Sequence, residues 1–305
     1  MSGAEIVLVE SAGELDELVA IFNELEDAAV TAARMRQMRV AMRRRDVLAR
    51  SEGQVVAFGL VGSFPGMEHV PEAAARFAVR PQFRGRGVGS RVHEELLRHA
   101  AELGRDGLEV EVAESDESSV AWLQRRGYRE TQRLFSLRLD LSSARLSEPE
   151  LPADIELTSL AEQPHRAVEL FDLVRETITD VPGTFGEQVP EEFEQWSALE
   201  LDPQSRPPEL AILALQGSAL VGAALARREG TEKVWHSYTC VRRGSRGQGI
   251  AYALKMAQLD AARATGCRWS ETDNHPDNAP MRHLNAKLGY QPCDVKITMV
   301  GGQSA

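Results

Sequence analysis

The chain has 305 residues, of which 43% are hydrophobic and 27% are charged, and this composition excludes a largely disordered or collagen-like protein. Because a domain usually holds about 100–200 residues, we expect two domains. The net charge of −11 is shared by both halves of the sequence, so neither half is a basic module that would bind nucleic acid without regard to sequence.

Membrane and export signals are not expected. No stretch of the sequence is long and apolar enough to predict a membrane span, and the first ten residues do not resemble a secretory signal. The three cysteines, Cys240, Cys267 and Cys293, have no CxxC or Cys/His spacing. This predicts a reduced, cytoplasmic protein without a metal site.

The first half of the sequence predicts an alternation of strands and helices. A strand is expected at 5–9, and helices follow at 13–26 and 31–45, where apolar residues recur at helical spacing. Glu52-Gly53 between two apolar runs predicts a hairpin. Further strands are expected at 46–50, 54–62, 72–80, 107–113 and 129–139, and further helices at 87–103 and 117–126.

The second half repeats this order. Arg84 and Arg246 lie in similar segments, and the spacing between them equals the spacing between Gly127 and Gly289, each of which precedes a tyrosine. Two motifs at one offset indicate a duplication. The second copy is expected to have strands at 154–158, 209–215, 218–228, 233–241, 268–273 and 290–299, and helices at 163–177, 250–265 and 278–288.

Serine and proline cluster between Leu141 and Pro152, which predicts a linker. The expected organisation is a first domain at 1–145, a linker at 146–152 and a second domain at 153–305. Each domain is expected to contain a right-handed strand–helix–strand crossover. The second copy carries additional sequence at 180–208, rich in proline and glycine, and we expect it to form loops over an acceptor site and to select the substrate.

Two glycine-rich segments, Arg84–Gly89 and Arg246–Ala251, lie between an expected strand and an expected helix. The first amides of a helix have no intrahelical partner and favour an anion, and glycine leaves room for a phosphate. A tight turn alone would also need glycine, but two copies with an arginine at the same place favour a pyrophosphate site. Ser90 and Tyr252 stand where a dinucleotide-binding GxGxxG motif needs glycine, and no GK[ST] follows either segment.

Both segments match the pattern Arg/Gln-x-x-Gly-x-Gly/Ala and resemble the acyl-CoA loop of the GNAT N-acetyltransferases. The run from Thr272 to Tyr290, with Asn274, Asn278 and Asn285, resembles a GNAT subgroup common in tandem actinobacterial proteins. The resemblance covers nearly the whole chain and implies two tandem GNAT-like domains of the α/β class with a mixed sheet. It implies acetyl-CoA as co-substrate, with its pyrophosphate on the loop amides. It also implies that the pantetheine arm pairs with the preceding strand where two strands splay apart, beside a main-chain N–H for the thioester oxyanion.

The residues that the resemblance assigns to coenzyme binding lie on each loop and on the strand before it. They are Phe77, Ala78, Val79, Arg84, Gly85, Arg86, Gly87, Val88 and Gly89 in the first copy, and Thr239, Cys240, Val241, Arg246, Gly247, Gln248, Gly249, Ile250, Ala251 and Asn278 in the second.

Transfer of acetyl to an amine requires a base or a water chain that removes the amine proton. His236 is the candidate base because the histidine pKa lies near neutrality, and Tyr238, two residues on, is expected on the same strand face. A half-buried histidine with a structural role is the alternative. The tyrosine that the family often carries on its last helix is replaced by Leu123 and Asn285, so the usual proton donor is missing from both copies.

The two copies also differ at the start of this last helix. Asn278 resembles a family asparagine that lies near the pantetheine, whereas the first copy has Asp116. We therefore expect the second copy to be catalytic and the first to bind CoA or to support the fold. In the first copy, Glu109 and Glu111 alternate on a strand and could hold a cationic acceptor, but a solvated strand face is the favoured alternative. Glu232 and Glu271 are weaker candidates in the second copy.

The resemblance thus implies an acyl-CoA-dependent N-acetyltransferase that acts by direct attack of a primary amine of a small molecule or peptide. No nucleic-acid or membrane partner is expected. The alternative is a non-catalytic acyl-CoA-binding sensor or interaction protein with two degenerate copies of the fold.

Overall fold

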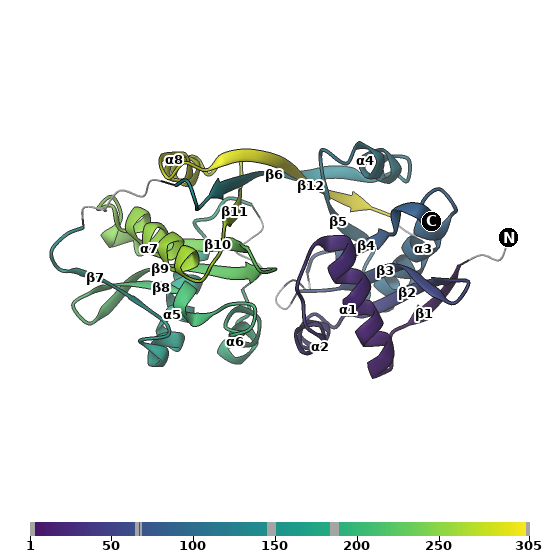
Figure 1. The fold of residues 1–305 in the computed structure, drawn as a ribbon, viewed down its shortest axis with the longest axis horizontal. Helices are drawn as coiled ribbons and strands as arrows, with labels where there is room; N and C mark the ends of the chain where they lie inside the picture. Colours follow the sequence, from purple (N-terminus) through teal and green to yellow (C-terminus); the bar gives the residue numbers. More distant parts are fainter. Residues whose placement is uncertain (1–3, 65–66, 68, 145–150, 184–188, 303–305) are drawn as a thin grey trace. The chain divides into compact units, whose positions relative to one another are not determined.

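The computed structural model describes residues 4–64, 67, 69–144, 151–183 and 189–302. Residues 146–150 of the predicted linker and 184–188 of the predicted loop segment lie outside them. The chain divides into two compact units. The first comprises Met1–Arg133 and Lys296–Ala305, and the second comprises Leu134–Val295 (Figure 1).

The first unit is built on a mixed sheet. Its strands are β1 (Glu5–Leu8), β2 (Arg45–Ser51), β3 (Gln54–Gly62), β4 (Glu72–Val79), β5 (Gly107–Ala113) and the end of β12 (Gln291–Gly301). Its helices are α1 (Ala12–Glu26), α2 (Ala32–Ala41), α3 (Val88–Glu102) and α4 (Glu117–Gln124). The strand order is β1-β2-β3-β4-β5-β12, and only β4 and β5 run parallel to each other.

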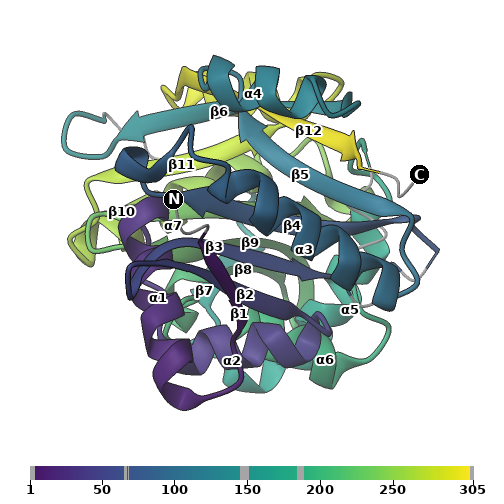
Figure 2. The same ribbon diagram turned by 90° about the vertical axis from the view of Figure 1, so that its right-hand side faces the viewer.

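Helices cover both faces of this sheet, because successive strand residues point to opposite sides. Phe58 and Leu60 of β3 pack with Phe22 of α1 in one buried cluster. Gly59 between them faces α3, where an added Cβ would lie 2.8 Å from a methyl group of Val92. The missing side chain therefore lets α3 pack closely along β3 and β4 (Figure 2).

The second unit repeats this plan. Its strands are the end of β6 (Arg129–Asp140), β7 (Ile155–Ser159), β8 (Ile212–Gln216), β9 (Ala219–Glu229), β10 (Lys233–Val241) and β11 (Trp269–Asn274). Its helices are α5 (Ala167–Ile178), α6 (Phe193–Glu200), α7 (Ile250–Ala264) and α8 (Ala279–Lys287). The strand order is β6-β11-β10-β9-β8-β7, and only β10 and β11 run parallel.

The two faces of the second sheet form separate cores. Leu213 and Leu225 pack with α5 and α6 in one buried cluster. Ala214 and Ala224 pack with Leu254 of α7 in another. The strand before the glycine loop therefore has α5 and α6 on one side and α7 on the other.

The last strand of each copy closes the sheet of the other unit. Residues Phe135–Asp140 of β6 pair antiparallel with β11, and Lys296–Gly301 of β12 pair antiparallel with β5. The sequence predicts both strands but not their partners, because alternating hydrophobicity identifies a strand and not its neighbour. The mixed α/β class is confirmed. The boundaries 1–145 and 153–305 stay a prediction of where the two sequence copies begin and end.

Two expectations about helices are wrong. The helix expected at 31–45 ends at Ala41, because Arg43 adopts a left-handed conformation with φ of 47° and β2 begins at Arg45. The segment 180–208 is not made of loops alone, since α6 forms within it. Trp196 of α6 is 2% exposed and its ring lies 5.3 Å from that of Phe171, so this part of the segment belongs to the core. No helix in the described part of the chain is both long and apolar enough to cross a bilayer.

Candidate functional site

The two glycine loops adopt the same backbone conformation. Gly85 and Gly87 have φ angles of 72° and 81°, and Gly247 and Gly249 have φ angles of 77° and 80°. Residues other than glycine rarely adopt these values, so the glycines are required by the shape of the loop. An added Cβ at Gly85, Gly87 or Gly247 would meet no atom within 4 Å, which means that open space lies above the loop.

Each loop opens directly into a helix. Gly87 is the N-cap of α3 and Gly249 the N-cap of α7, and neither helix has a side-chain capping hydrogen bond. The first amides of both helices therefore face the open side without a capping acceptor, and the helix dipole favours negative charge there. This cradle fits a diphosphate such as that of coenzyme A.

The loop arginines are held in the same way in both units. Arg84 Nε donates to the carbonyl of Val79 at 3.0 Å, and Arg246 Nε donates to the carbonyl of Val241 at 2.9 Å. Each guanidinium is thus fixed to the last residue of the preceding strand. In the second unit, Nη2 of Arg246 also contacts the carboxylate of Asp180 at 2.5 Å.

The parallel strands splay apart beside each loop. Pairing of β4 with β5 ends at Ala75 and Val110, and pairing of β10 with β11 ends at Trp235 and Glu271. The ends of β4 and β10, which include the predicted coenzyme-binding residues 77–79 and 239–241, lie beyond this pairing. Each unit therefore places backbone groups at an opening between strands next to its glycine loop.

A β-bulge distinguishes the second unit. The register of β10 against β9 shifts between His236 and Tyr238, so Ser237 is an additional residue, whereas the pairing of β4 with β3 shows no shift. Bulges turn neighbouring side chains and often lie next to active sites. His236 and Tyr238 consequently point to opposite faces, and the expectation that they share a face is wrong.

His236 is buried on the α7 side of the sheet. Its Nδ1 contacts Oε1 of Gln258, and its Nε2 lies 2.6 Å from the hydroxyl oxygen of Thr239. Burial, together with the nearby Lys255, holds the pKa of His236 well below its ordinary value. The imidazole is therefore neutral, and both of its nitrogens are hydrogen-bonded within the protein.

Tyr238 lies on the other side, against α5. Its hydroxyl donates to the hydroxyl oxygen of Thr177 at 3.0 Å. Burial raises the pKa of Tyr238 above its ordinary value, so the phenol stays protonated at neutral pH.

The starts of α4 and α8 are equivalent in the two units. Asn278 caps α8, because its Oδ1 accepts from the amide of Met281 at 3.2 Å, and Asp116 caps α4 by accepting from the amide of Ser119 at 3.1 Å. The side-chain oxygen of Asn278 is thus engaged by its own helix.

The residues that replace the usual tyrosine are both buried. Leu123 is 2% exposed and Asn285 is 0% exposed. Asn285 Nδ2 donates to Oδ1 of Asn274 at 2.8 Å. Neither side chain carries an acidic proton, so a proton donor has to come from another element.

The acidic candidates have different surroundings. Glu109 lies opposite Ala74 on β4, and burial raises its pKa, with a further contribution from Glu72 and Glu111. Glu271 contacts Arg138 at 2.6 Å. Glu271 is therefore neutralised within the second unit, whereas Glu109 is destabilised as an anion.

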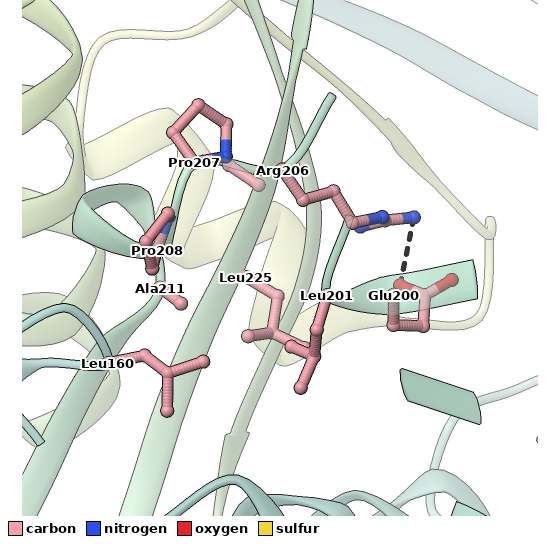
Figure 3. Close-up of a pocket in the computed structure, with 9 residues that line it drawn as sticks. Leu160, Glu200, Leu201, Arg206, Pro207, Pro208, Ala211 and Leu225 are labelled. Atoms are coloured by element: carbon pink, nitrogen blue, oxygen red, sulfur yellow. Dashed lines mark ion pairs between the residues drawn. The ribbon is translucent and has the colours of Figure 1, made fainter. Parts of the chain in front are cut away.

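A small pocket of about 20 Å³ lies next to the bulge in the second unit (Figure 3). An ion pair of 2.8 Å between Arg206 and Glu200 closes one side, and Leu160 and Leu225 line another. Arg206 Nη1 also donates to the hydroxyl oxygen of Ser237 at 3.1 Å. The pocket has room for about one water molecule, and the additional segment is tied through Arg206 to the bulge.

Sequence reasoning does not select Ser237, Arg206 or Asp180 as functional candidates. The bulge follows only from a pairing register, and Arg206 reaches Ser237 across 31 residues of sequence. Asp180 is predicted only to lie in a loop, although it contacts an arginine 66 residues away. None of these contacts has a periodic signal in the sequence.

The comparisons with known proteins agree with this geometry. The model of the acetyltransferase (GNAT) family matches residues 15–128 and 169–290. Among curated proteins, none matches the chain. Because the family model matches two separate regions, it supports two copies of the fold in tandem. The actinobacterial type stays a prediction.

Solved structures of the same fold cover nearly the whole chain. A tandem GNAT protein from the clavulanic acid biosynthesis pathway is 21% identical, covers 99% of this chain and 100% of its own, and superposes with a TM-score of 0.80. A GCN5-related N-acetyltransferase from Sphaerobacter thermophilus is 19% identical over 97% of this chain and 95% of its own, with a TM-score of 0.68. With the family model matched twice and two glycine loops of one geometry, the chain belongs to the GNAT acetyltransferase family and carries its fold in tandem.

Proposed function

We propose that this protein transfers an acetyl group from acetyl-CoA to a primary amine of a small molecule or peptide. The observation that carries this proposal is the pairing, in each unit, of an uncapped helix start with an opening between parallel strands. The loop amides bind the diphosphate, and the backbone of residues 77–79 and 239–241 lies beside the pantetheine arm.

The second unit is the catalytic one in this proposal. Only its strand carries the bulge at Ser237, two residues beyond Trp235, where the pairing of β10 with β11 ends. A bulge leaves a backbone amide outside the ladder, and such an amide can donate to a developing oxyanion. The first unit binds coenzyme or supports the fold.

The reaction forms a bond between the amine nitrogen and the carbonyl carbon and breaks the bond between that carbon and sulfur. The amine loses one proton to water or a base, and the departing thiolate gains one. Tyr238 lies next to Thr239 on the part of β10 that β11 does not pair, so we assign it the donation to the thiolate, which requires its hydroxyl to leave Thr177. His236 positions Thr239 through their hydrogen bond of 2.6 Å.

The non-catalytic alternative has support of its own. Leu123 and Asn285 replace the usual tyrosine, and a sensor would need coenzyme binding alone. Either way the protein acts in the cytoplasm, where its three unpaired cysteines stay reduced.

The test begins with binding. Acetyl-CoA and CoA should each raise the melting temperature, and native mass spectrometry should count two coenzymes per chain. Arg84→Glu should remove one of them and Arg246→Glu the other, because each introduces negative charge at a diphosphate site. Arg268→Glu is the control, since Arg268 directly precedes the paired end of β11, away from both loops, and is 56% exposed.

Release of free thiol over a panel of primary amines then separates an enzyme from a sensor. Turnover that survives Arg84→Glu but not Arg246→Glu supports catalysis by the second unit. Binding without turnover supports the sensor. A protein that neither coenzyme stabilises would contradict both functions.

A further inference from the structure

Asp180 contacts Arg246 of the second glycine loop and also Arg243, which lies three residues before that loop. Its Oδ1 lies 2.6 Å from Nη2 of Arg243, and its Oδ2 lies 2.5 Å from Nη2 of Arg246. Arg243 Nε adds a third contact at 3.2 Å. Hydrogen bonds from the two guanidiniums lower the pKa of Asp180 to about 2, so the carboxylate is charged at all physiological pH values.

This contact is a feature of the second unit alone. α5 ends at Ile178 and α1 at Glu26, so Asp180 and Ala28 each stand two residues beyond the helix. Arg243 has Pro81 as its counterpart in the first copy. Arg84, the counterpart of Arg246, has no carboxylate within ion-pair distance among the residues that the structure describes.

A neighbouring ion pair is shared by both units and shows what an ordinary structural pair looks like here. Arg242 contacts Glu176 at 3.0 Å, and its counterpart Arg80 contacts Glu24 at 2.6 Å. Both glutamates lie in the last turn of the first helix of their unit. The two units thus keep this pair, and the second unit adds the contact of Asp180 to the loop.

The chemistry of the added contact is that of a ligand. A carboxylate that bridges two guanidiniums makes the same charge-assisted hydrogen bonds that a phosphate would make. Once the carboxylate is in place, part of the positive charge available to an incoming diphosphate is neutralised, and like charges repel.

We propose that Asp180 competes with the coenzyme diphosphate for Arg243 and Arg246, so that the second unit binds CoA more weakly than its loop alone would allow. The first unit, which lacks this carboxylate, binds CoA first as its concentration rises. This inference rests on the proposed coenzyme sites and adds the order of their affinities for CoA. For CoA to occupy the catalytic unit, Asp180 must release Arg243 and Arg246.

The experiment isolates the second loop in an Arg84→Glu background and measures CoA binding by isothermal titration calorimetry. Asp180→Asn keeps the size of the side chain and removes its charge, and it should lower the dissociation constant about two- to fivefold, the range expected for an exposed ion pair. Glu176→Gln is the matched control and should leave the constant unchanged. S-acetylpantetheine, which has no diphosphate, should bind equally to all variants.

Each other result overturns the inference. Equal CoA affinity of the Asp180→Asn and Glu176→Gln variants would mean that Asp180 does not compete, and weaker binding by Asp180→Asn would mean that it orients the arginines for the phosphates. A gain for S-acetylpantetheine equal to that for CoA would place the effect away from the diphosphate. Failure of the wild-type chain to bind CoA at either loop would instead overturn the proposed function.

Discussion

Each unit buries a basic nitrogen against the tyrosine of its Gly-Tyr pair. In the first unit, His93 Nε2 lies 2.8 Å from the hydroxyl of Tyr128. At the equivalent position of the second unit, Nζ of Lys255 lies 5.0 Å from the ring centre of Tyr290, and burial holds the pKa of Lys255 well below its ordinary value. His93 lies on α3 and Lys255 on α7, the helix that follows the glycine loop in each unit. The two copies thus keep a basic side chain at this position but differ in its type, imidazole in one and amine in the other.

His93 should make the first unit sensitive to mild acid. Burial and the nearby Arg126 lower its pKa to about 4, from an ordinary value of 6.5. The folded state therefore binds fewer protons than the unfolded state between these values, and stability falls as pH drops from 6.5 to 4, by up to about 3 kcal/mol. Denaturant titrations at neutral pH and at a pH just above the lowered pKa should show this loss in the wild type and much less of it in His93→Gln. An equal loss in both proteins would exclude His93 as its source.

At the scale of elements, one additional residue decides which groups face the coenzyme opening. The spacing of His236 and Tyr238 predicts a shared face, and the bulge at Ser237 separates them. A hydrogen bond from Arg206 holds this bulge from outside the strand, so its presence depends on a contact distant in sequence. The glycine loops behave differently, because their left-handed glycines specify the turn locally.

Helix α3 should depend on the missing side chain of Gly59. A Cβ there would lie 2.8 Å from Val92 and 2.9 Å from Val47, inside the packed face beneath the helix. Gly59→Ala should lower the free energy of unfolding by about 1–3 kcal/mol through overpacking. Gly13→Ala is the control, since an added Cβ in α1 meets no atom within 4 Å and stability should stay equal or rise slightly. Equal stability of wild type and Gly59→Ala in chemical denaturation would contradict this packing.

At the scale of the whole molecule, the exchange of last strands makes each unit depend on both halves of the sequence. The sheet of the first unit ends with Lys296–Gly301, and that of the second begins with Phe135–Asp140. The segment Met1–Arg133 alone leaves the outer edge of β5 without this partner. A sheet edge without its partner exposes backbone groups and apolar surface.

Removal of residues 296–305, at the C-terminal end of the chain, should therefore destabilise the first unit, which is built mainly from Met1–Arg133. Amides of β5 and β4 should lose protection in hydrogen exchange, because β5 loses the strand that pairs with it. Amides of β8 and β9, which belong to the second unit, serve as the internal control and should keep theirs. Loss of protection confined to β9 and β10 would contradict the assignment of Lys296–Gly301 to the sheet of the first unit.

The sequence by itself determined the duplication, the order of the strands and of the helices other than α6, the mixed α/β class and the two glycine loops. These features rest on local signals: periodicity, two motifs repeated at one offset, and glycines whose backbone angles no other residue adopts easily. Only the tertiary structure decided which sheet each last strand joins, which face His236 presents, that α6 completes a core, and that Asp180 reaches Arg246. These features depend on pairing and on charge contacts between residues far apart in the chain, and such contacts leave no periodic trace in the order of the residues.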